Sequence, residues 1–495
     1  MIISKVNVLF EKTVYVLFAI FITACTYLSL SNDASRKGFV IFGNDLYWYT
    51  FLAVFLAAAF CGMYLICLII NKYGVKNYTV SLAAILLIAF SARFIWINMF
   101  EVIPKYDFSL FYSYATQYAK GNFVGRDYIS MFPHTFGYSF ILSLIFRIFG
   151  TSVYAAQLFN VILGCGITAL ISFLGTRLFD VKIGLLAALL YAVWPSQIFY
   201  TVLVSTEELF TLIMLLCIYL FISAMKKTDR MFIRMGVISL ICALMNGIRP
   251  FGILLIAAFF IVLVLKKHLL PALILAVAYV VFFNAISLGV STIINKDVAK
   301  SPMGFNLFVG SDIKYMGRWN AEDSKVYTDL TKDSTFNAQE VHDKLAAMAF
   351  QRFKDQGTDN IRLFADKYKA MWSVDYDIIS YVNTGLDAST KSAETFNKMR
   401  RYLTAVSNLY YLAMLLFCLI FAFWSIKKSS YKSMTIMLIV LGVTVIHLLM
   451  EVHGRYHYPV ISLFALTAAC GANVLFNIIK KNDIMLGDTP LPPTN

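Results

Sequence analysis

Asp107 is the residue of this sequence best placed to act as a catalytic acid or base. It lies in the polar segment 101–112, directly after a long apolar run. A carboxylate at the point where a chain leaves a bilayer can meet a water-soluble group and a lipid-borne group together. Such a side chain can take a proton from an attacking hydroxyl or amine, and exclusion of water would raise its pKa toward the working range. A solvated loop carboxylate is the simpler alternative.

Two arginines lie in polar turns between later apolar runs, and their chemistry suits a phosphate. Arg249 stands before a proline, and Arg455 belongs to the cluster 451–459. A guanidinium at such a turn either snorkels to lipid headgroups or binds a phosphate through its fork of donors. The cluster predicts a phosphate site made by Arg455 with His453 or His457. Anchoring at the membrane interface by tyrosines is the alternative. The other polar members of this cluster include Glu451 and Tyr456.

Glu207 and Glu208 open another apolar run. Carboxylates suit a helix N-terminus, because its free amides are partly positive. If the pair is functional, one of them binds an acceptor or a divalent cation, Mg²⁺ or Mn²⁺, beside Asp107. No motif indicates any other cofactor. Further on, Asn306 lies in a segment whose composition is typical of a sugar-stacking loop, although exposed aromatics are also common in domains that lean on a membrane.

The composition places these residues in a membrane protein. Hydrophobic residues make up 60% of the chain, charged residues 14%, and the mean hydropathy is +0.72. A soluble domain carries about 25% charged residues. Apolar runs long enough to cross a bilayer recur along the chain. The net charge of +14 is explained by short basic loops on one side of the membrane, so no nucleic acid partner is expected.

Length and hydropathy predict about twelve membrane-spanning helices. Basic loops follow every second span and fall on one side if the N-terminus is cytoplasmic, which places both termini in the cytoplasm and Asp107 outside. Segment 135–149 is then a helix along the membrane surface, as is 108–120, because a further crossing would move the later basic loops outside. The expected spans cover residues 13–31, 48–70, 79–98, 153–176, 183–200, 207–225, 232–249, 251–265, 271–293, 404–426, 433–450 and 458–479.

The chain divides into a membrane core and one sizeable aqueous insert. The insert, 294–403, is expected to hold helices at 337–357, with a capping box at its start, and at 359–372. The remaining boundaries are an additional N-terminal transmembrane hairpin at 1–78, a transmembrane core at 79–293 with a catalytic outer loop at 99–152, C-terminal transmembrane helices at 404–481, and a disordered tail at 482–495.

The order of several short motifs resembles a known superfamily. The sequence is similar to polytopic glycosyltransferases of the GT-C type, in particular to bacterial relatives of dolichyl-phosphate-mannose-protein mannosyltransferases and to aminoarabinose transferases. The resemblance covers most of the chain after residue 80, although a Lys-Pro-Pro run of the aminoarabinose transferases is replaced here by Met131-Phe-Pro-His134. It is carried by the Asp107 segment with Tyr112, Ala115 and Gly121, by 133–138, 149–152 and 177–180, by Trp194-Pro195 before Glu207, by Arg249-Pro250, by Lys367, Lys369 and Trp372, and by Arg455-Tyr456 with Pro459.

The resemblance implies an all-α GT-C fold with two membrane-surface helices in the first large outer loop and a small outer-face domain. It implies a cell-envelope enzyme that inverts a hexose or pentose taken from a polyprenyl-phosphate carrier, with Asp107 as the base. The acceptor would be a protein, a lipid or a cell-wall polymer. The leaving phosphate would be neutralised by Arg126, Arg249 and Arg455, with Arg126 or His134 in place of the missing lysine. The acceptor, sugar or ion would meet Tyr112, Glu207, Glu208, Asn306, Glu451, His453 and Tyr456.

Two other functions remain open from the residues alone. A flippase or transporter of lipid-linked sugars would share the membrane architecture, but such proteins usually place charges at mid-bilayer. Here the spans are nearly free of charge and the charged residues gather at one face, which favours an enzyme. A polymerase or ligase that joins lipid-linked glycans would use the same kind of site.

Overall fold

The computed structural model describes residues 2–32, 45–226, 229–333, 335–427 and 430–487. These residues fold into helices joined by short turns, and within them the only β pairing is an isolated bridge between Val102 and Leu386. The prediction of an all-α membrane protein is confirmed.

Nine of the described helices are long and apolar enough to cross a membrane. A tenth span would join α9 and α10, which are bent by 58° at a break, whereas α12 and α13 are shorter apolar helices. The chain is therefore a multi-pass membrane protein, and the count of about twelve stays a prediction. The nine are α1 (Ile2–Leu30), α3 (Asp45–Ile69), α4 (Tyr78–Met99), α8 (Val153–Leu178), α11 (Glu207–Lys226), α14 (Leu269–Ile294), α20 (Lys391–Lys427), α21 (Tyr431–Leu449) and α22 (Tyr458–Gly487); the other four are α9 (Val181–Ala192), α10 (Pro195–Phe199), α12 (Met231–Asn246) and α13 (Gly252–Leu265).

The break between α9 and α10 follows from the local sequence. Pro195 lacks a backbone N–H and fixes its own φ, so it opens a helix well but does not continue one. It stands at the first turn of α10, after Trp194 in extended conformation. The buried Trp194 ring next to the break donates from Nε1 to Asp375, which belongs to the insert.

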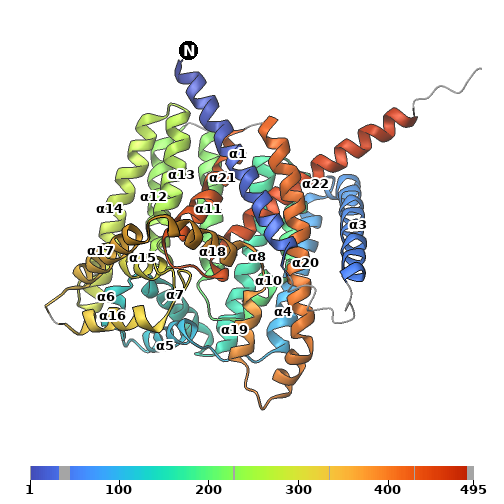
Figure 1. The fold of residues 1–495 in the computed structure, drawn as a ribbon. Helices are drawn as coiled ribbons and strands as arrows, with labels where there is room; N and C mark the ends of the chain where they lie inside the picture. Colours follow the sequence, from blue (N-terminus) through green and yellow to red (C-terminus); the bar gives the residue numbers. More distant parts are fainter. Residues whose placement is uncertain (1, 33–44, 227–228, 334, 428–429, 488–495) are drawn as a thin grey trace, which may run out of the picture.

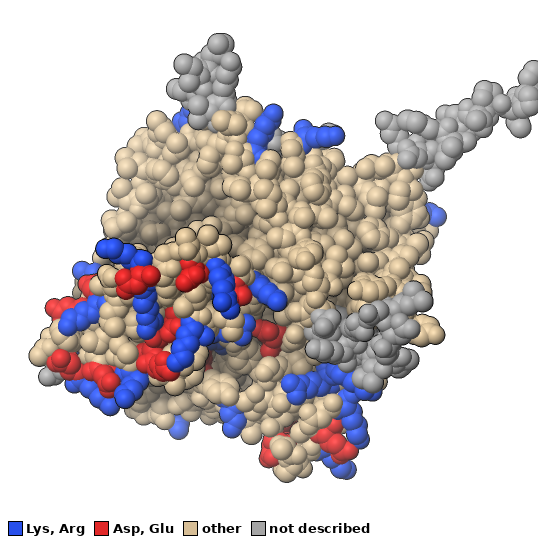
Figure 2. Space-filling model, in the orientation of Figure 1, with Lys and Arg blue, Asp and Glu red and all other residues tan. Residues whose placement is uncertain are grey.

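Charges and connections divide the bundle into two ends. In Figure 1 the N-terminus and the ends of α13 and α20 near Lys266 and Lys427 lie at the top, whereas α5, α6 and α16 lie at the bottom. Figure 2 shows acidic and basic side chains crowded over the insert, while the flank of the bundle is nearly free of them. The two ends are separated as the basic loops predicted, and the assignment of the upper end to the cytoplasm stays a prediction.

Both helices expected in the first outer loop are present. They are α5 (Asp107–Ala119) and α7 (His134–Phe149), and a short helix that was not predicted, α6 (Arg126–Met131), lies between them. The apolar face of α5 packs on α7, with the Phe111 and Tyr138 rings 5.5 Å apart. The placement of these helices along the membrane surface stays a prediction.

The insert is more helical than its sequence suggested. Its two predicted helices are confirmed as α17 (Ala338–Gln356), with the capping box of Asn337 and Glu340, and α18 (Asn360–Trp372). It also contains α15 (Gly304–Gly310), α16 (Ala321–Lys332) and α19 (Asp377–Gly385). The insert is anchored to the outer loop, because the His342 ring shares a hydrogen bond of 2.9 Å with the carbonyl of Met131.

Three features of the predicted domain organisation differ from the structure. Helix α20 begins at Lys391, so the boundary at 403 falls inside a continuous helix. Helix α22 runs to Gly487, so the segment 482–487 is helical rather than part of a disordered tail, and residues 488–495 lie outside the described chain. The first two spans do not form a hairpin, because α1 packs against α20 and α21 whereas α3 packs against α22.

Candidate active site

The loop that follows α4 presents Asp107 at the start of a helix. This loop is held to the end of α19, where the Ile103 N–H donates to the Gly385 carbonyl over 2.8 Å. Tyr106 then takes a positive φ of 53°, a conformation that is rare for a bulky residue and is often found at functional sites. The reversal starts α5 at Asp107, whose side chain is 53% exposed. A carboxylate at this position is stabilised by the free amides of the first helical turn.

Asp107 forms an ion pair with Arg455, which is 348 residues away in the sequence. The Arg455 Nη2 donates to Asp107 Oδ2 over 2.8 Å, and the Arg455 side chain is only 15% exposed. Its guanidinium carbon lies 5.4–5.6 Å from the ring centres of Phe108, Tyr381 and Tyr456. Its Nε is buried and has no hydrogen-bond partner among the described residues. Arg455 is therefore oriented by aromatic rings and keeps donors for a further anion.

Arg249 also lies close to the Tyr456 ring. It forms an ion pair with Glu207, which is 1% exposed at the start of α11, and its Nε donates to Thr206 Oγ1 over 2.9 Å. The guanidinium carbon of Arg249 is 5.9 Å from the Tyr456 ring centre. Two of the three arginines predicted to bind phosphate, from different loops, thus lie within 5.9 Å of the centre of one tyrosine ring.

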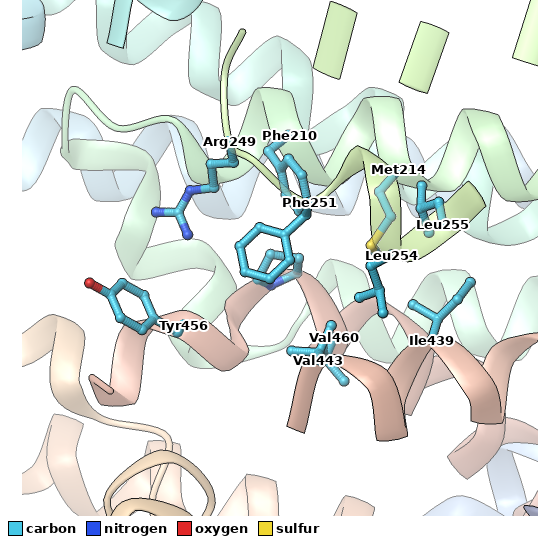
Figure 3. Close-up of a pocket in the computed structure, with 11 residues that line it drawn as sticks. Phe210, Met214, Arg249, Phe251, Leu254, Leu255, Ile439, Val443, Tyr456 and Val460 are labelled. Atoms are coloured by element: carbon cyan, nitrogen blue, oxygen red, sulfur yellow. The ribbon is translucent and has the colours of Figure 1, made fainter. Parts of the chain in front are cut away.

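An apolar crevice opens beside Arg249 (Figure 3). It lies between α11, α13, α21 and the start of α22. Among its lining residues, only Arg249 and Tyr456 carry polar side-chain groups, and Figure 3 shows them together at one end of the crevice. Its free volume is only about 10 Å³, so a hydrocarbon chain could enter it only if the surrounding helices moved apart. The apolar lining consists of Phe210, Met214, Phe251, Leu254, Leu255, Ile439, Val443, Pro459 and Val460.

Glu451 adds a second carboxylate to the site. Burial raises the pKa of Glu451, while the nearby charges of Arg455 and His453 lower it and that of Asp107 raises it. Its backbone N–H donates to the Asn306 carbonyl over 2.7 Å. Asn306 belongs to helix α15, and its backbone carbonyl holds Glu451 in place; its contact with a sugar stays a prediction.

His134 and Tyr128 complete the surroundings of Asp107. Burial lowers the pKa of His134 to about 4, with a smaller lowering from Arg249 and an opposing effect of Asp107. Its buried Nδ1 has no hydrogen-bond partner among the described residues. At neutral pH this ring is uncharged and can exchange hydrogen bonds with a ligand. Burial, followed by the charge of Asp107, raises the pKa of Tyr128, a residue that the sequence did not single out.

Some predicted residues lie outside this cluster. The Tyr112 hydroxyl donates to the Thr151 carbonyl over 3.3 Å, and its ring packs against α7. Glu208 is fully buried and accepts a hydrogen bond from Ser205. Arg126 is exposed at the start of α6 and makes no described contact with Asp107 or Arg455. In the described chain no group of three or more acidic, histidine or cysteine side chains is arranged to hold a metal ion.

His457 has a structural role and is not part of a phosphate site. It is 3% exposed; its Nε2 lies 3.0 Å from Asp375 Oδ1, and its Nδ1 lies 2.5 Å from the Met371 carbonyl. The other oxygen of Asp375 accepts from Trp194 Nε1 and Ser196 Oγ, each over 2.7 Å. Because both ring nitrogens face acceptors, the buried pair fixes the backbone two residues after Arg455. Asp375 was not predicted from the sequence as part of this arrangement.

Known proteins offer two kinds of similarity. A sequence model of the dolichyl-phosphate-mannose-protein mannosyltransferase family matches residues 133–290. The archaeal oligosaccharyltransferase AglB from Archaeoglobus fulgidus, in complex with an inhibitory peptide and a dolichol-phosphate, is 14% identical, with a TM-score of 0.47 over 85% of this chain and 53% of that one. Its apo form is also 14% identical to this chain, with a TM-score of 0.48 over 86% of this chain and 53% of that one.

This chain thus spans about half the length of those structures, and no curated protein sequence matches it. The matched segment 133–290 contains His134, Glu207 and Arg249, but neither Asp107 nor Arg455. Over residues 133–290 the predicted resemblance to this family of membrane glycosyltransferases is therefore confirmed.

Proposed function

We propose that this chain is a glycosyltransferase that moves a sugar from a polyprenyl-phosphate carrier to an acceptor at the outer face of the membrane. The observation that carries the proposal is the position of the Asp107–Arg455 ion pair, which is linked through Tyr456 to an apolar crevice with Arg249 at its end. A hydrocarbon tail, a phosphate and a reacting carbon need these three environments in this order.

The crevice suits the lipid part of the donor. Its free volume is about 10 Å³, so the helices around it would have to part before its apolar lining could take the first isoprene units and remove them from water. The phosphate would lie next to Tyr456, between the guanidinium groups of Arg249 and Arg455. Arginine binds phosphate through parallel N–H donors, and these bonds are stronger where water is excluded. Neutral His134 would donate or accept a further hydrogen bond.

Asp107 is the base in the proposed reaction. As the acceptor oxygen attacks the anomeric carbon, its proton passes to the Asp107 carboxylate. The bond from the anomeric carbon to the phosphate oxygen breaks, and its electron pair leaves with the phosphate, whose growing charge is stabilised by the two arginines. Attack from the face opposite to the leaving group inverts the sugar. Arg455 would hold Asp107 in place before the donor arrives and share its donors with the phosphate afterwards.

The test compares Asp107→Asn with Asp127→Asn. General base catalysis contributes about 10²- to 10⁴-fold, so Asp107→Asn is expected to lower sugar transfer by that factor. Asp127 is 92% exposed and pairs with Lys296 on the surface, so its replacement should leave transfer within about twofold of wild type.

Transfer is measured by mass spectrometry of outer-face glycans, glycolipids and glycoproteins, with the amount of each variant in the membrane as a control. Normal transfer by Asp107→Asn would refute the mechanism. If Asp107→Asn still formed the glycosylated product and its lipid-linked precursor still crossed the membrane, the result would favour a flippase.

A further inference from the structure

A second cavity, of about 700 Å³, opens beside Asp107 and shares no lining residue with the apolar crevice. Its wall includes Tyr106, which precedes Asp107, and Tyr381, whose ring centre lies 5.4 Å from the Arg455 guanidinium carbon. A ligand in this cleft would therefore reach Asp107 from a different side than a lipid in the crevice.

The cleft is polar over most of its wall. It carries charges of both signs, from Arg318 and Lys369 and from Asp366 and Asp377. Hydroxyl groups come from tyrosines, serines and a threonine, whereas aliphatic side chains are few. A cavity of this volume suits a ligand of ordinary small-molecule size or the end of a polymer.

Three side chains form an ordered cluster on the wall nearest to Arg455. His453 lies 3.4 Å from Asp377 Oδ2 and 3.1 Å from the Tyr381 hydroxyl. Asp377 and Tyr381 are one turn apart on α19, and their side chains point to the same face. Gly454 allows this arrangement, because a Cβ at that position would collide with the Asp377 carboxylate. His453 remains 40% exposed, so its ring can meet a ligand.

We infer that this cleft, with His453, Asp377 and Tyr381 on its wall, is the acceptor site of the transferase and that it accepts the hydroxyl-rich end of a glycan. The inference rests on the proposed function. Tyrosine rings with hydroxyl, carboxylate and imidazole groups between them can stack on sugar rings and hydrogen-bond to sugar hydroxyls. The mixed charges favour a glycan without a strong net charge.

A peptide acceptor fits the cleft less well. Extended peptides bind by pairing with a strand edge or by placing apolar side chains in pockets. The described walls are helices and turns, and Met316, Ala370 and Val374 are the only aliphatic residues that line the cleft.

The experiment fills the cleft without touching Asp107 or the arginines. Ser380 is an exposed residue of α19 that lines the cleft, and Ser380→Trp would occupy it. Thr331→Trp, on the exposed surface of α16, is the matched control. Thr384→Trp, one turn further along α19, is a second variant in case the first does not fold.

Cells without the chain are compared with cells that express wild type or each variant. The product that depends on the chain is identified by mass spectrometry, and binding of undecaprenyl phosphate to each purified full-length protein is measured separately. We expect the product to be a glycan extended by one sugar, reduced more than about tenfold by Ser380→Trp, with binding of undecaprenyl phosphate unchanged. Thr331→Trp should resemble wild type.

Wild-type amounts of product from folded Ser380→Trp and Thr384→Trp would overturn the acceptor site. A product that protease converts to glycopeptides would overturn the glycan class. The absence of any product that depends on the chain would refute the proposed function itself, an outcome distinct from the other two.

Discussion

Replacement of Arg249 separates its structural role from its proposed role in donor binding. The Glu207 carboxylate is 1% exposed and pairs with Arg249, so Arg249→Met would leave a buried charge without its partner. Loss of one member of a buried ion pair costs about 3–5 kcal/mol. Glu207→Gln in the same chain removes that charge, and the double variant should recover most of this stability. Stability is measured by thermal unfolding in detergent, followed by intrinsic fluorescence.

Donor binding should respond differently to the same variants. A hydrogen bond to a charged group contributes about 1.5–3 kcal/mol, which corresponds to about 10- to 150-fold in Kd. We expect the double variant to bind undecaprenyl phosphate weaker by this factor although it is folded. Glu207→Gln alone frees the Arg249 guanidinium and should bind at least as tightly as wild type. Wild-type affinity in the double variant would refute the assignment of Arg249 to the phosphate.

Two further predictions concern the insert and the metal. Lys367 is fully buried, its Nζ donates to the Gly310 carbonyl over 2.8 Å, and burial lowers its pKa from 10.5 to about 7. Between these two pH values only the unfolded chain binds the proton, so the stability of wild type should rise with pH. From pH 7.5 to 9.5 we expect its free energy of unfolding to increase by about 1.4 kcal/mol per pH unit relative to that of Lys367→Met. Chemical unfolding at several pH values measures both slopes, and equal slopes would contradict this prediction. We expect EDTA to leave the rate of sugar transfer within about twofold of the untreated rate, because Arg249 and Arg455 already supply two positive charges to the phosphate. A loss of transfer that Mg²⁺ or Mn²⁺ reverses would show that a divalent cation is essential.

The sequence predicted the residues of the site that interrupt long apolar runs. Asp107, Arg249 and Arg455 each lie in a short polar turn between hydrophobic segments, and a charge near a bilayer is costly unless it is paired or functional. Hydropathy also separated the two ends of the bundle, so these three residues could be assigned to one end. Their actual contacts were not predictable, because Asp107 and Arg455 are 348 residues apart.

Elements of the insert were harder to predict for a physical reason. Helices α15 and α19 are only seven and nine residues long, and they are stabilised by burial of Phe308 and of Ile378, Ile379 and Val382. Short helices depend on tertiary packing for their stability. The polar cleft was missed for the same reason, since its wall joins residues from the loop before α5, the turn at 316–318, α18, α19 and the turn at 453–454. The positive φ of Tyr106 gave no signal either, because glycine and asparagine are the residues that usually mark that conformation.

The arrangement around Arg455 explains how a site made of loops can be well positioned. Arg455 lies in the short turn η4 (Gly454–His457), yet both neighbours of this turn are held from other helices. On one side Gly454 packs against Asp377, and on the other the His457–Asp375 pair reaches the Trp194 indole and the Ser196 hydroxyl. Catalytic groups must be held within fractions of an ångström of their working geometry, and groups that are already oriented need no rearrangement during the reaction. We therefore expect the buried pair to position Arg455 for the proposed reaction although it contacts neither donor nor acceptor, since it holds the backbone two residues after Arg455.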